Sequence, residues 1–194
     1  MFFSEYLPKF LKVREQGFIN VCKMSSVMII VITGTPGTGK TTLAKALATR
    51  LDIEYISDKH IIDKYDLAEG FDNERNAAII DEERFAQALE QETRDKNAVI
   101  DSHLSHFIDP AKVDLCIVTT CELGTLKKRL QLRDYSDQKI RENLDAQIFE
   151  TCFFEAQELG HNVLEINTES QIDLLVEEIL EEIKKQETTK NCDI

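Results

Sequence analysis

The sequence predicts an α/β protein in which a mostly parallel β-sheet carries helices on both faces. Short apolar runs alternate along the chain with helical patterns, and this alternation is typical of such sheets. The first apolar run, residues 27–32, leads into a glycine-rich turn and then into a helical run. A chain of 194 residues buries about 70% of its unfolded surface on folding, so one domain with a full core is expected.

Five strands and five helices follow from the apolar pattern. The predicted strands cover residues 28–33, 54–56, 97–101, 113–119 and 162–166. Four helices are predicted at residues 40–51, 81–94, 122–132 and 136–158. A last helix carries one apolar stripe, formed by Ile172, Leu175, Val176, Ile179 and Ile183. Residues 57–80 are polar, and we predict a helix-poor excursion there on the substrate side.

The octapeptide GTPGTGKT that begins at Gly34 matches the pattern G-x-x-x-x-G-K-S/T. Its glycines, including Gly37 and Gly39, let backbone N–H groups converge on phosphate oxygens at the positive end of the next helix. Lys40 is predicted to reach the β and γ phosphates, and the Thr41 hydroxyl to ligate a bridging Mg²⁺. The alternative is a glycine-rich turn with an incidental lysine, which the flanking strand and helix disfavour.

A magnesium–nucleotide site also needs an acid at the carboxyl end of a strand beside the phosphate loop. Asp101 ends a predicted buried strand, and we predict that it holds the coordination shell of the ion. The alternative is an acid that only ends the strand and caps the next turn. His103 is predicted to line the same crevice and position a water or hydroxyl, or else to be an ordinary loop histidine, and His106 has the weaker case.

Phosphoryl transfer requires cations that meet the charge developing on the transferred group. Arg133 stands at a junction between two predicted helices and is predicted to swing over the nucleotide as part of a short lid. Four other cations are each predicted to be ordinary solvated helix charges, namely Lys127, Lys128, Arg129 and Arg141. The predicted catalytic residues are Lys40, Asp101, His103 and Arg133.

Five motifs occur in order: GTPGTGKTT at 34–42, EGFD at 69–72, DEER at 81–84, VIDSH at 99–103 and RDYSDQKIREN at 133–143. Together they resemble the small adenylate kinase family found in archaea and, as adenylate kinase isoenzyme six, in eukaryotes. The resemblance covers about residues 28–168. The first motif is shared by many P-loop proteins, but the ordered set, with the R-x-Y-x-x-x-K lid, is specific to this family.

The resemblance implies a three-layer P-loop kinase fold with a five-stranded parallel sheet, in a domain at residues 28–186 followed by a polar tail at 187–194. It implies a monophosphate-binding segment at 57–80 and a lid at 132–142. ATP would lie on Gly37, Gly39, Lys40, Thr41, Thr42 and Arg133. Where eukaryotic members have Gly-Asp-Leu, this chain reads Lys59-His60-Ile61, which leaves the preferred monophosphate open.

The implied activity is a broad nucleoside monophosphate kinase that converts ATP and AMP to two ADP with Mg²⁺, with some ATPase activity. The resemblance also implies a role in late small-subunit and rRNA maturation, through a platform ribosomal protein on pre-ribosomal particles. Two alternatives stay open. One is an ATPase assembly factor acting on a ribosomal protein, and the other is a P-loop kinase for a small metabolite such as shikimate, gluconate or dephospho-coenzyme A.

The composition restricts the class of partner. A formal net charge of -13 argues against broad binding to a nucleic acid backbone, and sequence-specific nucleic acid binding is not expected. No apolar stretch approaches the length of a membrane span. The five cysteines form no C-x-x-C pair and no metal-ligand spacing with the histidines, so we interpret them as reduced thiols of a cytoplasmic protein.

Residues 1–27 are predicted to be either an amphipathic interaction segment or an untranslated extension ahead of Met24 or Met28. Charged residues and Pro8 interrupt the apolar positions, so the segment is not a secretory signal. Deleting residues 1–27 should preserve the kinase rate per molecule, because the first strand and the phosphate loop are complete from Met28. ADP formation by the truncated and full chains tests this, and a folded truncation with little activity would contradict it.

Overall fold

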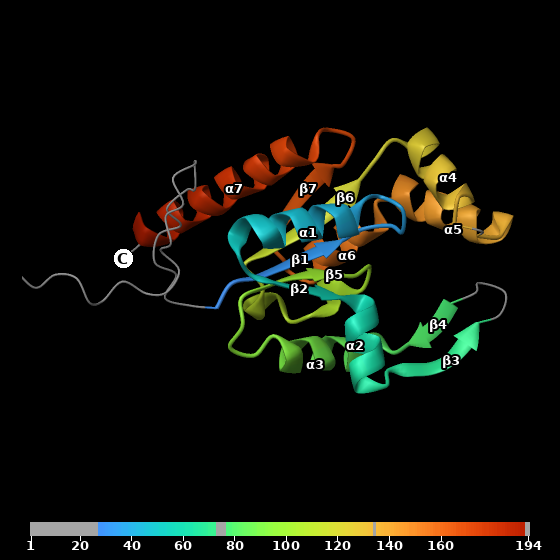
Figure 1. The fold of residues 1–194 in the computed structure, drawn as a ribbon, viewed down its shortest axis with the longest axis horizontal. Coiled ribbons are helices and arrows are strands. Elements are labelled where there is room, and N and C mark those ends of the chain that lie inside the picture. Colours follow the sequence, from blue (N-terminus) through green and yellow to red (C-terminus); the bar gives the residue numbers. More distant parts are fainter. Residues whose placement is uncertain (1–26, 73–76, 134, 193–194) are drawn as a thin grey trace, which may run out of the picture.

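The computed structural model describes residues 27–72, 77–133 and 135–192. Its main sheet has five parallel strands in the order β2-β5-β1-β6-β7 (Figure 1). These strands are β1 (Ile29–Thr33), β2 (Glu54–Ser57), β5 (Ala98–Asp101), β6 (Leu115–Thr120) and β7 (Val163–Asn167). The predicted parallel α/β fold is therefore confirmed, and so is each of its five strands.

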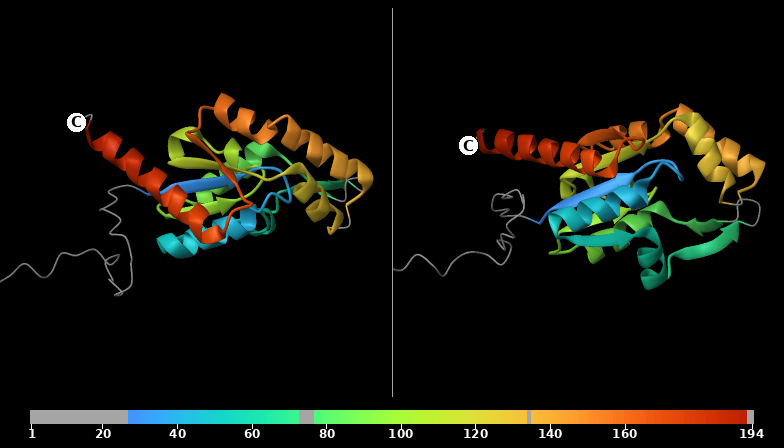
Figure 2. Two further views of the ribbon diagram at one scale, coloured as in Figure 1. Left: turned by 90° about the horizontal axis from the view of Figure 1, so that it is seen from above. Right: turned by 45° about the horizontal axis from the view of Figure 1, so that its top comes forward.

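Helices cover both faces of this sheet (Figures 1 and 2). The described helices are α1 (Lys40–Leu51), α2 (Asp58–Tyr65), α3 (Glu82–Glu92), α4 (Leu123–Gln131), α5 (Asp137–Ile148), α6 (Thr151–Glu158) and α7 (Ile172–Cys192). One apolar core lies between the sheet and α1 and α7, and a second lies between the sheet and α2, α3 and α6. The last helix continues into the predicted tail at 187–194, and no described helix is long and apolar enough to cross a membrane.

The first strand shows why the central strands consist of unbroken apolar residues. Ile30 and Ile32 pack into the core beneath α1 and α7, whereas Ile29 and Val31 pack into the opposite core. All four side chains are buried. A parallel strand covered on both faces cannot alternate apolar with polar residues, so the run 29–32 identifies a central strand.

The prediction that residues 57–80 are helix-poor is wrong. Helix α2 begins there, and the Ser57 hydroxyl caps it by accepting the N–H of His60 at 3.3 Å. A two-stranded antiparallel sheet follows, formed by β3 (Ala68–Asp72) and β4 (Ala77–Ile80). Ile61 is the only fully buried residue of α2, with Ile62 and Tyr65 partly buried beside it, and a helix of eight residues is shorter than the window in which a helical period is recognised.

The prediction of one continuous helix over 136–158 is also wrong. Helix α5 ends at Ile148, and Glu150 adopts a left-handed conformation with φ of 51° before α6 begins. The break lets the two helices pack in different cores. Ile140 of α5 packs with α4, whereas Ala156 of α6 packs against the sheet. No glycine or proline marks the break, so the local pattern gives no sign of it.

Two parts of the chain lie beyond the carboxyl ends of the central strands. The pair α4 and α5 lies there, and the β3–β4 hairpin lies there on the other side of the molecule (Figures 1 and 2). The pair has a small core of its own, built from Cys121, Leu126, Leu130 and Ile140. The space that a ligand would enter at this edge of the sheet is therefore flanked by two separate structural units.

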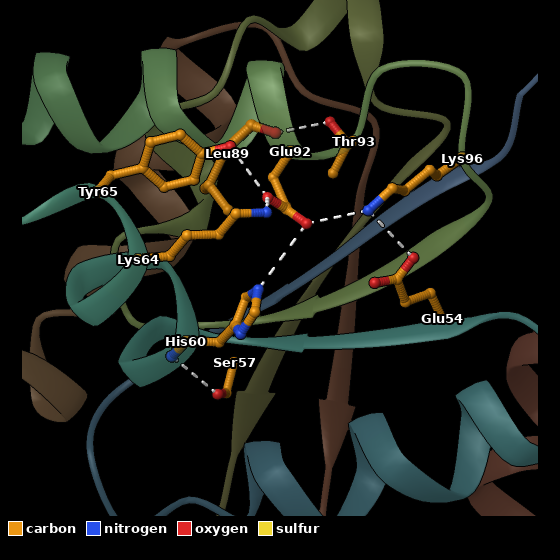
Figure 3. A network of polar contacts seen from close by, with 9 residues as sticks. All are labelled: Glu54, Ser57, His60, Lys64, Tyr65, Leu89, Glu92, Thr93 and Lys96. Carbon is orange, nitrogen blue, oxygen red and sulfur yellow. Dashed lines mark hydrogen bonds and ion pairs between the residues drawn. The ribbon is translucent and has the colours of Figure 1, made fainter.

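One buried carboxylate joins α2 to α3 (Figure 3). Glu92 is 4% exposed and lies at the end of α3. It accepts hydrogen bonds from Lys64 Nζ at 2.5 Å, Tyr65 Oη at 2.9 Å and Lys96 Nζ at 2.9 Å. These bonds, that of Lys64 above all, lower the pKa of Glu92 from 4.5 to about 2. Its charge is therefore part of the folded structure at neutral pH.

Replacing Glu92 should change how stability depends on pH. A carboxylate whose pKa is depressed on folding contributes stability that is fully present above 4.5 and is lost as the pH falls toward about 2. Glu92→Gln should therefore be less stable than wild type at pH 7, with a difference that shrinks between pH 4.5 and pH 2. Urea unfolding at several pH values measures this, and a difference that stays constant from pH 7 to pH 2.5 would contradict it.

Candidate active site

A cleft of about 1130 Å³ lies at the carboxyl edge of the main sheet. Its walls include the phosphate loop, the starts of α2 and α3, the turn after β5, and parts of α4, α5 and α6. All eight residues predicted for the site line this cleft, namely Gly37, Gly39, Lys40, Thr41, Thr42, Asp101, His103 and Arg133. Open parallel sheets bind ligands at this edge, so the eight residues form one candidate site.

The phosphate loop depends on glycine for its backbone conformation. Gly34, Gly37 and Gly39 have φ values of 130°, 96° and 105°, which side-chain-bearing residues rarely adopt. A Cβ atom on Gly34 would lie 2.5 Å from the carbonyl oxygen of Thr119. Helix α1 follows the loop directly, and no side chain caps it at Gly39. An uncapped helix start with converging amides is the arrangement that suits a phosphate.

Threonine hydroxyls anchor the loop from two sides. The Thr38 hydroxyl donates to the carbonyl of Thr35 at 2.8 Å and lies 2.6 Å from the Thr119 hydroxyl of β6. The Thr168 hydroxyl, after β7, donates to the carbonyl of Thr38 and, at 3.2 Å, to that of Thr120. Sequence reasoning missed Thr168, because only the β6–β7 pairing brings it to the loop.

Lys40 is the central cation of the loop. Its ammonium donates to the carbonyl oxygens of Gly34 at 2.7 Å and Thr35 at 3.1 Å. Burial lowers the pKa of Lys40 to about 8, against the opposing attraction of Asp101. At pH 7 the side chain is therefore mostly charged but loses its proton more readily than an exposed lysine. A phosphate in the loop would give this ammonium the anion it lacks.

Asp101 stands beside Thr41, as the magnesium prediction requires. The Thr41 hydroxyl donates to Asp101 Oδ2 at 2.6 Å, and Tyr55 Oη donates to the same oxygen at 2.9 Å. A hydroxyl and a carboxylate are the hard oxygen ligands that Mg²⁺ prefers, and the ion commonly takes its other ligands from phosphates and water.

Tyr55 was not predicted as a site residue. Burial and the adjacent Asp101 charge raise its pKa, so the phenol stays protonated and remains a hydrogen-bond donor. Its position follows from the pairing of β2 with β5, in which Ser57 lies opposite Asp101. A strand register of this kind has no signature in the local sequence.

The two histidines of the turn after β5 have different environments. His103 lines the cleft, where burial and the charges of Lys40 and Lys139 lower its pKa to about 4. It is therefore neutral at pH 7 and can accept or donate one hydrogen bond. His106 is 1% exposed, and its ring nitrogens contact Thr33 Oγ1 at 2.8 Å and Glu155 Oε2 at 3.2 Å.

The prediction that Arg129 is an ordinary solvated charge is wrong. Its Nη1 donates to the carbonyl oxygen of Gly37 at 3.2 Å, and the side chain lines the cleft. Arg133 lines the same cleft from the turn after α4. Arg141 points elsewhere, with an exposed side chain 3.9 Å from Asp145. A cationic wall therefore faces the phosphate loop from α4 and the turn that follows it.

Carboxylates line the opposite wall, and sequence reasoning missed them as well. Asp58 is the first residue of α2, Glu82 is the first residue of α3, and both line the cleft. Burial raises the pKa of Asp58, and the charge of Asp101 raises it further. Because Ser57 pairs with Asp101, Asp58 follows directly at the same sheet edge. Cations are therefore concentrated beside the phosphate loop, whereas carboxylates line more than one wall, since Glu142 of α5 and Glu155 of α6 line the cleft as well.

The chain is similar to known proteins over most of its length. A family model described as an AAA domain matches residues 30–150. A protein of Methanocaldococcus jannaschii named "Putative adenylate kinase" is 36% identical over 165 residues, which cover 84% of this chain and 90% of that protein. A protein of Saccharomyces cerevisiae named "Adenylate kinase isoenzyme 6 homolog FAP7" is 34% identical over 149 residues, which cover 75% and 76%.

Solved structures with the same fold are more distant in sequence. A shikimate kinase from Acinetobacter baumannii in complex with shikimate has a TM-score of 0.61 at 18% identity, covering 83% of this chain and 95% of its own. A deoxyadenosine kinase from M. mycoides has a TM-score of 0.53 at 15% identity, covering 81% and 100%. At these identities the likeness is one of fold.

Lys40 should make ATP binding depend on pH. Above about pH 8 the free ammonium loses its proton, whereas a bound triphosphate favours the protonated form. Binding should then take up a proton, and the affinity should fall by up to about tenfold per pH unit. Calorimetry in two buffers of different ionisation enthalpy measures the uptake. Lys40→Arg, which keeps its charge, should lack this pH dependence, and a wild type equally insensitive between pH 7.5 and 9.5 would contradict the assignment.

Proposed function

The chain belongs to the adenylate kinase family that includes adenylate kinase isoenzyme 6, and on that premise we propose that it is a nucleoside monophosphate kinase acting in the cytoplasm. The proposed reaction transfers the γ phosphoryl group of ATP to AMP or a related monophosphate and releases two nucleoside diphosphates. Membership of a kinase family supports phosphoryl transfer in general. The acceptor and the location are the finer parts of the proposal.

One observation carries the proposal: a single cleft joins the phosphate loop to the walls formed by α2 and α3. The loop and the cations Lys40, Arg129 and Arg133 suit the triphosphate of one nucleotide. The start of α2 and the start of α3 bound the rest of the cleft, where an acceptor has room beside the γ phosphate. A cleft that holds both substrates excludes bulk water and aligns the reacting groups.

Each predicted residue has a defined part in this reaction. Thr41 and Asp101 would hold Mg²⁺, which would neutralise negative charge on the phosphates. Lys40 and Arg133 would stabilise the negative charge that spreads over the transferred group. His103, neutral at pH 7, would position the attacking oxygen of the acceptor by a hydrogen bond.

We also propose ATP hydrolysis in the service of small-subunit maturation as a second function. The support is the resemblance to the isoenzyme six family and the net charge of -13, which favours association with a very basic ribosomal protein. Water would then take the place of the acceptor in the same cleft. A small-metabolite kinase is the third possibility, since shikimate kinases share the fold.

The deciding experiment measures ADP formation from MgATP in the presence and absence of AMP. A nucleoside monophosphate kinase should form ADP much faster with AMP, at two ADP for each ATP consumed. A pure ATPase should form one ADP per ATP at a rate that AMP does not raise. A panel containing other monophosphates, shikimate, gluconate and dephospho-coenzyme A tests the acceptor, and a preference for a non-nucleotide would overturn the first proposal.

Asp101→Asn should weaken the response to magnesium and lower the rate at least a hundredfold, about 2.7 kcal/mol of transition-state stabilisation. The amide keeps the shape of the carboxylate, so Thr41 and Tyr55 can still donate to its oxygen and the fold should survive. The measurement is a magnesium titration of the rate, with Asp114→Asn as a control outside the cleft. If Asp101→Asn keeps the wild-type titration and activity, the carboxylate only ends its strand.

A further inference from the structure

The carboxylate of Glu92 accepts hydrogen bonds from the carboxyl-terminal end of α2 and from the segment that follows α3 (Figure 3). Lys64 and Tyr65 approach it from the end of α2, and Lys96 approaches from the segment that leads to β5. His60 Nε2 of α2 lies 3.8 Å from the same carboxylate. Lys96 also lies 3.5 Å from Glu54 of β2, so the contacts extend to the sheet.

This arrangement is not the most stable way to pack two helices. A buried carboxylate at the carboxyl-terminal end of a helix faces the negative end of the helix dipole, and its desolvation is costly. An apolar side chain of similar size would often give equal or greater stability. A hydrogen-bonded carboxylate adds geometric specificity, because its two oxygens fix the positions of the groups that donate to it. The network therefore sets the angle of α2 against α3.

Both helices begin in the cleft and meet at Glu92. Asp58 opens α2 and Glu82 opens α3, and both of these residues line the cleft. Helix α2 is eight residues long, so its far end lies about 12 Å from its start. Because Ser57 is paired with Asp101 in the sheet, the start of α2 is anchored, and a small rotation of the helix at Glu92 would change the direction in which the Asp58 side chain points. Ile61 is the only fully buried side chain of α2, with Ile62 and Tyr65 partly buried against the same core.

We propose that Glu92 is a positioning residue for the phosphoryl acceptor, acting by holding α2 so that Asp58 faces the acceptor side of the cleft. This inference rests on the proposed kinase function. Asp58 would accept a hydrogen bond from a hydroxyl of the acceptor nucleotide. The ATP side of the cleft is built from the phosphate loop, α4 and the following turn, none of which donates to Glu92, so the effect falls mainly on the acceptor.

The test compares Glu92→Gln and Lys64→Met with a matched control, Glu90→Gln. Glu90 lies on the same helix and pairs with Lys112 at 2.5 Å, away from α2. Lys64 and Lys96 are 47% and 40% exposed, so both can turn to water when Glu92 is replaced and the variant should fold. Each variant is measured for KM of AMP, KM of ATP and kcat, and for hydrogen exchange of the α2 amides.

Glu92→Gln and Lys64→Met should raise the KM for AMP about tenfold, in proportion to a lost charge-assisted hydrogen bond. The KM for ATP should stay within twofold of wild type, exchange should quicken more in α2 than in β1 or α1, and Glu90→Gln should match wild type. In an Asp58→Asn background, adding Glu92→Gln should raise the KM for AMP much less, because the effect passes through Asp58.

Three results would overturn the inference. The first is an unchanged KM for AMP in Glu92→Gln while the wild type uses AMP, which would leave the kinase function standing. The second is an equal rise in both KM values with faster exchange throughout the sheet, because Glu92 would then act on general stability. The third is full additivity with Asp58→Asn. A wild type that transfers no phosphoryl group to AMP would instead refute the kinase function, and this inference with it.

Discussion

The register of β1 between its two neighbours determines where the chemistry of this protein lies. Ile32 pairs with Asp101 on one side and with Ile117 on the other, so the phosphate loop leaves β1 beside the end of β5. The Thr41 hydroxyl can then reach Asp101 across the sheet edge. A shift of one residue would point Asp101 into a core and remove the acid from the loop.

Around that edge the molecule separates two kinds of charge. The phosphate loop and the end of α4 supply Lys40, Arg129 and Arg133, and the first residues of α2 and α3 supply carboxylates. Each wall belongs to a unit with its own packing. The cationic wall includes the small core shared by α4 and α5, whereas the acidic wall lies on helices joined through Glu92. A ligand that enters the cleft therefore meets two walls that are stabilised independently of each other.

The most deeply buried polar side chains of this protein make hydrogen bonds to other protein groups. Glu92 has three donors, the Thr38 hydroxyl is shared between Thr35 and Thr119, and His106 contacts Thr33. His161 Nδ1 is the one buried side-chain polar atom without a hydrogen bond in the described residues. Polar pairing of this kind costs stability relative to an apolar core, but it fixes the orientation of loops and helices around the cleft.

The features that depend on local chemistry could be predicted from the amino-acid pattern alone. The phosphate loop can be predicted because its backbone conformation requires glycines at fixed positions. The central strands can be predicted because burial on both faces requires an unbroken apolar run. Asp101 could be predicted because it stands directly after such a run. Each of these sequence patterns lies within a few residues of the group that it predicts. The structure places the phosphate loop and Asp101 at the same sheet edge.

The residues that complete the site come from distant segments, and they could be identified only in the folded protein. In the sequence, Arg129 does not differ from other helix cations, and only the packing of α4 brings it to the phosphate loop. Tyr55 reaches Asp101 only through the pairing of β2 with β5. Helix α2 was missed because its eight residues are too few to show a clear helical period, and the break at Glu150 was missed because it arises from the packing of α5 and α6 into two different cores. Contacts between segments far apart in sequence leave no periodic trace in either segment, and the chain must fold before they exist.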